Sequence, residues 1–139
     1  MEFISHSAEE TRAFGKSLSE KALPGQVYAL TGNLGAGKTV LAQGFAEGLG
    51  VLETVNSPTF TILQVYEEGR LPFYHFDVYR IEDPYEMEEI GFDEYLNGDG
   101  VCLIEWADEI GELLPKDTIR ITIERDVEAG DDIRRITVQ

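Results

Sequence analysis

A single eight-residue stretch constrains the fold of this chain more than any other part of the sequence. Residues 32–39 read Gly-Asn-Leu-Gly-Ala-Gly-Lys-Thr and fit the pattern G-x-x-x-x-G-K-[ST] of a phosphate-binding loop. The apolar run 27–31 before it predicts a buried strand, and apolar residues at helical spacing over 41–49 predict a helix that Gly50 ends. Because strand, loop and helix follow in the order that such a loop requires, the sequence predicts an α/β fold.

The residues of this loop have the chemistry that a nucleotide site needs. Glycines let the backbone approach phosphate closely, and the loop N–H groups form an anion nest at the positive end of the next helix. The Lys38 ammonium can lie between the β- and γ-phosphates, and the Thr39 hydroxyl can ligate Mg²⁺. We expect the loop to contact nucleotide through Asn33, Leu34, Gly35, Ala36, Gly37, Lys38 and Thr39.

An acidic residue follows the most apolar run in the second half of the chain. The run 101–104 suits a central parallel strand buried on both faces, and Glu105 comes at its end, where ligands of such sheets bind. Glu105 stands where P-loop proteins usually place an Asp, so we expect it to bind Mg²⁺ through water or to act as a base. Trp106 either packs over the site or presents a contact surface.

Residues 61–66 and 71–79 predict two strands joined by a turn at 67–70. Their alternation places His75 and Asp77 on the same face. In a nucleotide site Asp77 can hold a metal-bound water or position the attacking one, whereas the alternative interpretation is an ordinary polar strand face.

Thr59 follows the P-loop helix in a segment, 55–60, that contains Pro58. Nucleotide switches place a residue that senses Mg²⁺ and the γ-phosphate in such a loop. The alternative interpretation is that the Asn, Ser and Pro of this segment simply form a turn that contacts no ligand.

The two ends of the chain add one candidate each. Ser7 predicts the start of a helix in which Thr11 faces either solvent or a ligand. Residues 118–125 and 133–138 predict two antiparallel strands that finish the sheet edge, where Arg134 or Arg135 either approaches the nucleotide or is a surface charge.

The charge distribution excludes direct binding to a nucleic-acid backbone, which needs clustered Lys and Arg. The net charge is −16, and the stretch between Ile81 and Pro115 contains twelve Asp and Glu but neither Lys nor Arg. This stretch is either a solvated face or a docking face for a basic protein partner.

The length of 139 residues predicts one domain. A signal peptide and a membrane-spanning apolar run are not evident, and the single cysteine, Cys102, lies in an apolar run. We therefore expect a cytoplasmic protein without a membrane partner.

Four motifs together resemble the bacterial TsaE (YjeE) family. They are Gly32–Thr39, Ser57–Phe60, His75–Arg80 and Leu103–Ala107, and the resemblance extends over nearly the whole chain. It implies one P-loop ATPase domain over residues 1–139, with a P-loop NTPase-like three-layer fold and a mixed, mainly parallel central sheet.

The resemblance also implies a function. Proteins of this family bind and hydrolyse ATP with Mg²⁺ as an accessory of the machinery that makes N6-threonylcarbamoyladenosine at position 37 of tRNA. They act with the TsaD and TsaB proteins and do not carry out the transfer themselves. The acidic charge of this chain fits contact with tRNA only through these partners.

The resemblance implies roles for individual residues. Lys38 would hold phosphates, and Thr39 and Glu105 would bind Mg²⁺, with Glu105 and Asp77 serving catalysis. The remaining roles are a switch residue, a residue at the partner-facing rim and two adenine contacts, and they fall on Thr59, Trp106, Thr11 and Arg134.

Two alternatives remain open from the sequence. A small-molecule P-loop kinase would need an Arg-bearing lid, but the middle of the chain has only Arg70 and Arg80. A nucleotide-dependent interaction switch would need binding but not turnover. Because no arginine is placed as an arginine finger, we expect hydrolysis to be slow alone and stimulated by partners.

Overall fold

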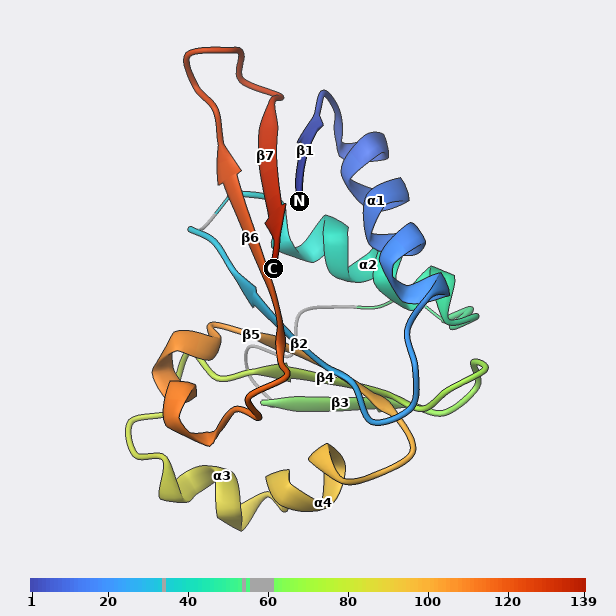
Figure 1. Ribbon diagram of the computed structural model, residues 1–139, viewed down its shortest axis with the longest axis vertical. Helices are drawn as coiled ribbons and strands as arrows, with labels where there is room; N and C mark the ends of the chain where they lie inside the picture. The colour runs from blue at the N-terminus through green and yellow to red at the C-terminus, as the bar shows by residue number, and fades with distance from the viewer. Residues whose placement is uncertain (34, 54, 56–61) are drawn as a thin grey trace.

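A seven-stranded mixed sheet forms the centre of the computed structural model (Figure 1), which describes residues 1–33, 35–53, 55 and 62–139 except for the side chains of 108 and 109. The strand order is β1-β7-β6-β2-β5-β4-β3. The strands are β1 (Glu2–Ser5), β2 (Val27–Thr31), β3 (Leu63–Tyr66), β4 (Phe73–Asp77), β5 (Val101–Glu105), β6 (Ile119–Arg125) and β7 (Arg134–Val138).

The parallel pairings are confined to the centre of this sheet. Strands β6, β2, β5 and β4 run parallel, whereas β1 with β7, β7 with β6 and β3 with β4 pair antiparallel. The prediction of a mixed α/β sheet is confirmed, but the sheet is mainly parallel only in its inner four strands.

One prediction about the sheet is wrong. Strands β6 and β7 do not finish the edge, because β6 lies beside β2 and β7 is covered by β1. Ile121 and Ile123 of β6 are fully buried. The alternating pattern of residues 119–125 is the same for an edge strand and an inner strand, and only the long-range pairings, of β6 with β2 and of β7 with β1, distinguish them.

Helices cover both faces of the sheet and form two hydrophobic cores. The α1 (Ala8–Glu20) and α2 (Lys38–Gly48) helices pack on one face with Tyr28 and Leu30 of β2. The α3 (Tyr85–Glu89), α4 (Phe92–Leu96) and 3₁₀ η1 (Ala107–Leu113) helices belong to the other face, where Val27 and Ala29 point. The alternation along a strand therefore gives three layers, as the family resemblance implies.

The α1 and α2 helices approach each other closely through glycine. The Oγ of Ser7 accepts a hydrogen bond from the backbone N–H of Glu10 (3.1 Å) and starts α1 as predicted. A Cβ added to Gly44 of α2 would overlap the backbone carbonyl of Arg12. This crossing therefore requires glycine at position 44, and it fixes α1 beside the helix that begins at the P-loop.

A side chain from the β3–β4 turn closes the other end of α1. One terminal guanidinium nitrogen of Arg70 donates to the carbonyl oxygens of Ser19 (2.6 Å), Glu20 (3.2 Å) and Ala22 (2.9 Å). The last turn of α1 has no basic residue of its own. Arg70 therefore satisfies carbonyl groups that a helix C-terminus leaves unpaired.

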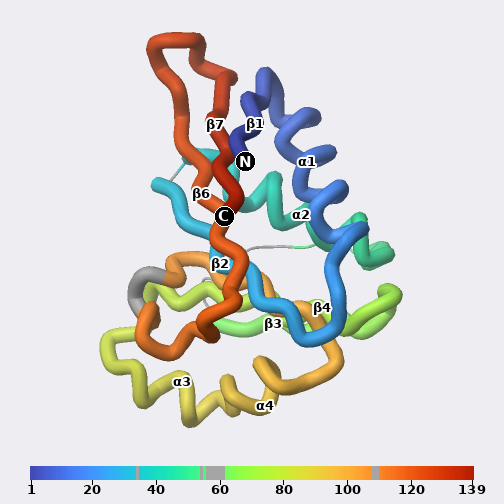
Figure 2. The backbone as a smooth tube through the Cα atoms, viewed as in Figure 1, coloured from blue at the N-terminus to red at the C-terminus, as the bar shows by residue number. Residues whose placement is uncertain are grey.

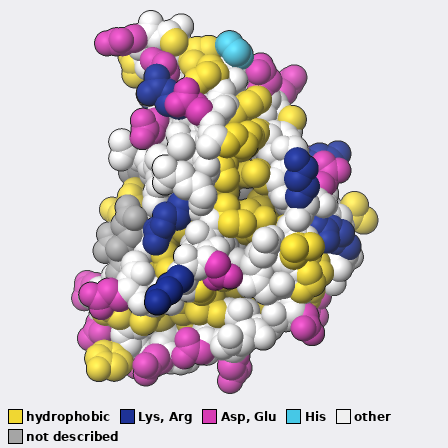
Figure 3. All heavy atoms as spheres, in the orientation of Figure 1, with side chains coloured by type: hydrophobic (Ala, Val, Ile, Leu, Met, Phe, Trp, Pro, Cys, Tyr) yellow, Lys and Arg dark blue, Asp and Glu magenta, His cyan; other side chains and the backbone are white. Residues whose placement is uncertain are grey.

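The backbone trace brings the two chain ends together at the β1–β7 pair (Figure 2). The amino group of Met1 donates to the carbonyl oxygen of Val138 (3.1 Å). Acidic side chains gather at the end of the molecule that contains α3 and α4 (Figure 3), where Glu86, Glu88 and Asp93 are exposed. No helix within the described ranges has the length and apolar character to cross a membrane.

Candidate nucleotide-binding site

The loop between β2 and α2 presents backbone donors at its mouth. Gly37 has a φ of +104° and is the N-cap residue of α2, with no side-chain cap hydrogen bond among the described residues. Such a φ favours glycine. The N–H groups of the first α2 turn have no partner within the helix, so they are available for an anion.

Lys38 is the first residue of α2 and folds back over the loop. Its Nζ donates to the carbonyl oxygen of Gly32 (2.6 Å) and lies 3.5 Å from the centroid of the Trp106 ring. Burial lowers the pKa of the Lys38 ammonium, and the negative charges of Glu105 and Asp77 oppose that shift. The ammonium thus lies within the electrostatic reach of both carboxylates.

The two carboxylates lie at the ends of neighbouring parallel strands. The register of β4 with β5 places Asp77 opposite Glu105, and each residue is 2% exposed. Oε2 of Glu105 lies 2.6 Å from Nε2 of His75, and Oδ1 of Asp77 accepts the backbone N–H of Tyr79 (3.0 Å). Because buried carboxylates are costly unless paired with positive charge, two of them at this end of the sheet favour a cation nearby.

These residues fit the Mg²⁺ ion that the P-loop implies. Carboxylate and hydroxyl oxygens are ligands that Mg²⁺ prefers, and Thr39 follows Lys38 at the start of α2. Among the described side chains, no group of three or more His, Cys, Asp or Glu is arranged to hold a metal by itself. The set therefore suits an ion that takes part of its coordination from phosphate oxygens and water.

Thr11 and Arg134 meet on the α1 side of the loop. They line a pocket of about 100 Å³ together with Gly37 and Val40. Nε of Arg134 donates to the carbonyl oxygen of Ala36 (3.0 Å), so β7 is tied to the loop. The Thr11 hydroxyl lies 2.7 Å from that of Ser5 and is buried, which leaves the methyl group nearer Gly37.

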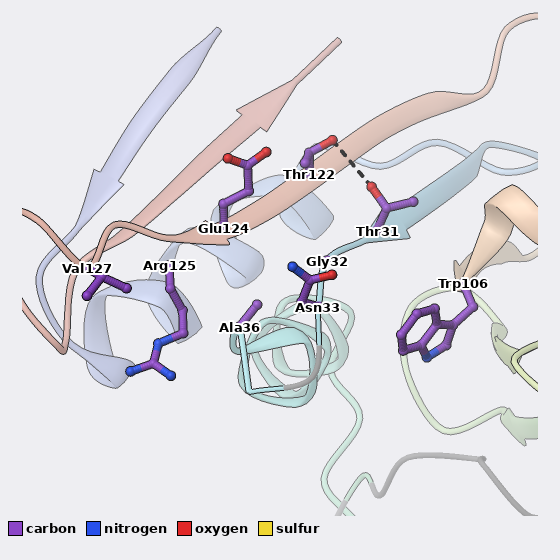
Figure 4. A pocket seen from close by; sticks show the side chains of 9 residues that line it. All are labelled: Thr31, Gly32, Asn33, Ala36, Trp106, Thr122, Glu124, Arg125 and Val127. Atoms are coloured by element: carbon purple, nitrogen blue, oxygen red, sulfur yellow. Dashed lines mark hydrogen bonds between the residues drawn. The ribbon is translucent and has the colours of Figure 1, made fainter.

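A larger pocket of about 660 Å³ is lined by Gly32, Asn33 and Ala36 of the loop (Figure 4). Trp106 borders it at one end, and β6 supplies Glu124 and Arg125 at the other. The hydroxyls of Thr31 and Thr122 lie 3.3 Å apart on its floor, between β2 and β6. The sequence did not indicate this pocket, because the pairing of β2 with β6 could not be predicted from it.

Comparison with known proteins decides the family. A family model described as threonylcarbamoyl adenosine biosynthesis protein TsaE matches residues 5–136. The chain belongs to the TsaE family. The resemblance that the four motifs carry is therefore confirmed.

TsaE-family relatives cover most of this chain. It is 56% identical over 129 residues to the tRNA threonylcarbamoyladenosine biosynthesis protein TsaE of Bacillus subtilis, covering 93% of this chain and 78% of that protein. It is 41% identical over 138 residues to the Treponema pallidum protein of the same name, covering 99% of both. A crystal structure of Bacillus subtilis YdiB superposes with a TM-score of 0.85 at 46% identity, covering 99% of this chain and 83% of that one.

The TsaE-family chain brings most of its predicted site residues to one place. The P-loop, Asp77 and Glu105 meet at the carboxyl ends of the inner strands, and Thr11 and Arg134 adjoin Gly37. Leu34 and Thr59 lie outside the described residues. For Trp106 the sequence left two interpretations open; the side chain is half-buried, 4.8 Å from the Tyr79 ring and over Lys38.

The structure places one residue at this candidate site for which the sequence predicted no role. His75 was predicted to share a face with Asp77, but no role was assigned to it. The side chain contacts Glu105 directly. The signal was present in the period-two alternation of 73–79, and it became decisive only with the parallel pairing of β4 and β5.

Proposed function

We propose that this TsaE-family protein binds ATP with Mg²⁺ and hydrolyses it within the machinery that makes N6-threonylcarbamoyladenosine at position 37 of tRNA. It acts with TsaD and TsaB and reaches tRNA only through them. The observation that carries the proposal is the register of Asp77 with Glu105, which places two buried carboxylates within electrostatic reach of the P-loop Lys38. The description of the matching family supports the pathway.

Each group in this proposal has a defined task. The first-turn N–H groups of α2 and Lys38 bind the β- and γ-phosphates, for which the ammonium exchanges the Gly32 carbonyl for phosphate oxygens. Thr39 and Glu105 hold Mg²⁺, which when bound neutralises phosphate charge. Asp77 and Glu105 orient the attacking water and accept its proton.

The base contacts of the proposal lie at the small pocket of Thr11 and Arg134. This pocket adjoins Gly37 at the start of α2. The adenosine portion extends from the phosphates past this residue, with Arg134 holding the loop from behind through the Ala36 carbonyl. Residues 1–139 act as one ATPase domain in this proposal, which predicts a single cooperative unfolding transition.

Hydrolysis by the isolated protein is slow in this proposal. Arg134 is engaged with the P-loop carbonyl of Ala36, and Arg70 with carbonyls of α1. Neither guanidinium faces the carboxylate end of the site, where charge develops on the transferred phosphoryl group. A partner that supplies a positive charge or orders the site would therefore accelerate turnover.

The decisive experiment is ATP hydrolysis by the purified protein with Mg²⁺, alone and with TsaD and TsaB. The rate is expected to rise with the partners and to collapse in Glu105→Ala, which still binds ATP. Lys38→Ala is expected to lose binding as well. A rate that is independent of the partners would leave the ATPase standing and overturn the assignment to this machinery.

The contact between Lys38 and Trp106 favours a second candidate, an interaction switch that needs nucleotide binding but not turnover. It links the phosphate-binding ammonium to a half-exposed ring. If Glu105→Ala supports repeated tRNA modification as well as the wild type, the switch is correct and hydrolysis is dispensable.

A further inference from the structure

We propose that His75 is a positioning residue that holds the carboxylate of Glu105 for catalysis. The inference rests on the proposed ATPase function and adds to it a residue that the loop and carboxylate motifs leave without a role. His75 acts through Glu105 and does not itself touch the nucleotide.

The contact between the two side chains is short and buried. Nε2 of His75 lies 2.6 Å from Oε2 of Glu105, and the side chains are 1% and 3% exposed. A hydrogen bond to a carboxylate is stronger than one between neutral groups, and exclusion of water strengthens it further. The bond therefore restricts the Glu105 side chain to one arrangement despite the number of its rotatable bonds.

The imidazole is itself held in place by the sheet. β4 lies between β3 and β5, and the register places His75 opposite Gln64 on one side and Leu103 on the other. The ring stacks on the fully buried ring of Phe73, with centroids 5.5 Å apart and planes inclined by 13°. A fixed backbone and a stacked ring give the donor one direction.

The surroundings of the ring select one tautomer. Because the Glu105 carboxylate accepts, the hydrogen lies on Nε2. Nδ1 is buried and has no hydrogen-bond partner among the described residues. A hydrogen on Nδ1 would be an unpaired buried donor, which is costly, whereas a hydrogen on Nε2 has the Glu105 carboxylate as its acceptor.

This geometry explains how a glutamate can serve where P-loop proteins usually have an aspartate. The side chain of Glu105 has one more rotatable bond than an aspartate. Fixing its carboxylate in the transition state therefore costs more conformational entropy. His75 binds Oε2 and leaves Oε1 for Mg²⁺ or water. The histidine thus compensates for the additional methylene.

The first test compares His75→Phe with His75→Gln in the complex with TsaD and TsaB. Phenylalanine keeps the stacking ring but has no donor, whereas the glutamine amide nitrogen reaches roughly the position of Nε2. We expect kcat to fall about 10- to 100-fold in His75→Phe, to recover largely in His75→Gln, and KM for ATP to stay within about twofold because the P-loop is untouched.

The second test measures coupling between the residues. In a Glu105→Gln background, His75→Phe is expected to lower the remaining rate by less than about twofold, since its target is already altered. Equal losses in His75→Phe and His75→Gln, or independent multiplication of the His75 and Glu105 effects, would overturn the proposal. His75→Asn, whose shorter amide reaches only the Nδ1 position, replaces His75→Phe if the latter does not fold.

A third test needs neither metal nor activity. The chain has two histidines, and His6 is exposed, so nitrogen NMR of the nucleotide-free protein resolves the His75 ring. We expect hydrogen on Nε2, with a resonance that shifts in Glu105→Gln but not in Asp77→Asn. Hydrogen on Nδ1 alone would overturn the proposal.

These measurements distinguish a failure of the proposed ATPase function from a failure of the positioning role of His75. A wild-type complex without ATP hydrolysis would contradict the proposed function, whereas the NMR test would still decide the His75–Glu105 contact. A wild-type complex that hydrolyses ATP, with His75→Phe at the same rate, would contradict the positioning role alone.

Discussion

The ammonium nitrogen of Lys38 lies 3.5 Å from the centroid of the Trp106 ring. The same nitrogen donates to the carbonyl oxygen of Gly32 (2.6 Å). Lys38 is the residue that would bind phosphate. The charge of this ammonium is satisfied by a carbonyl dipole and an aromatic face.

Removing the indole is expected to tighten nucleotide binding. A cation–π contact contributes about 0.5–2 kcal/mol and competes with phosphate for the ammonium, so Trp106→Leu should lower the Kd for ATP by about 2- to 30-fold. Trp106→Phe keeps a ring and is the matched control, with an affinity close to that of the wild type. Calorimetric titration measures both, and weaker binding in Trp106→Leu would show that the indole contacts the nucleotide instead.

The link between β7 and the P-loop predicts a role for Arg134 in affinity. Arg134→Ala loses the hydrogen bond to the Ala36 carbonyl and should weaken ATP binding about 3- to 10-fold, or about 1 kcal/mol, since the group is only half-buried. Arg135→Ala is the control, because Arg135 pairs with Asp126 (3.2 Å) on the surface. Equal effects of the two substitutions on the Kd would refute a specific role.

The crossing of α1 and α2 makes Gly44 critical for stability. A methyl group there would overlap the Arg12 carbonyl, and overpacking against backbone typically destabilises by about 1–3 kcal/mol. Gly44→Ala should accordingly lower the Tm by about 5–10 °C. Gly111→Ala is the control, since a Cβ there meets no described atom within 4 Å, and its Tm should match the wild type.

Burial makes the single cysteine unreactive in the folded protein. Burial raises the pKa of the Cys102 thiol to about 12, so almost no thiolate exists at pH 8. A thiol reagent at pH 8 should label Cys102 only as fast as the protein unfolds, and urea should accelerate labelling in proportion to the unfolded fraction. Rapid labelling without urea would contradict this burial.

The raised pKa of Cys102 also makes the stability of the fold depend on pH. The unfolded thiol ionises at a lower pH than the folded one, so this contribution to stability is complete below about pH 8.5 and decreases as the pH rises toward 12. The free energy of unfolding should therefore fall less between pH 8 and pH 10 in Cys102→Ala than in the wild type. Denaturant titrations at the two pH values measure this difference.

Local patterns were sufficient for the elements of this fold but not for all of their neighbours. The apolar runs of β2 and β5, the Ser7 cap and the P-loop gave correct predictions because each depends on residues adjacent in sequence. The inner positions of β6 and β7 depend on their pairing with β2 and β1, which lie far away in the sequence. Alternation along a strand contains no information about which strand lies beside it.

The candidate site likewise combines residues that local patterns predict with contacts that depend on long-range strand pairing. Lys38 was predicted from the P-loop pattern, and Glu105 and Asp77 from their places at the end of or within predicted strands. The contact of His75 with Glu105 joins residues 30 positions apart, and it required the β4–β5 register. Thr11 and Arg134 were suggested by the family resemblance, and the structure places both at one small pocket beside Gly37.

The Arg70 contact with the end of α1 has a consequence for the order in which the protein forms. Arg70 reaches carbonyl groups 48 to 51 residues earlier in the chain. Closing so long a loop is entropically expensive, so this cap can form only once the β3–β4 hairpin has docked. The last turn of α1 should therefore be among the late parts of the molecule to become protected from hydrogen exchange during refolding, although its first turn is capped locally by Ser7.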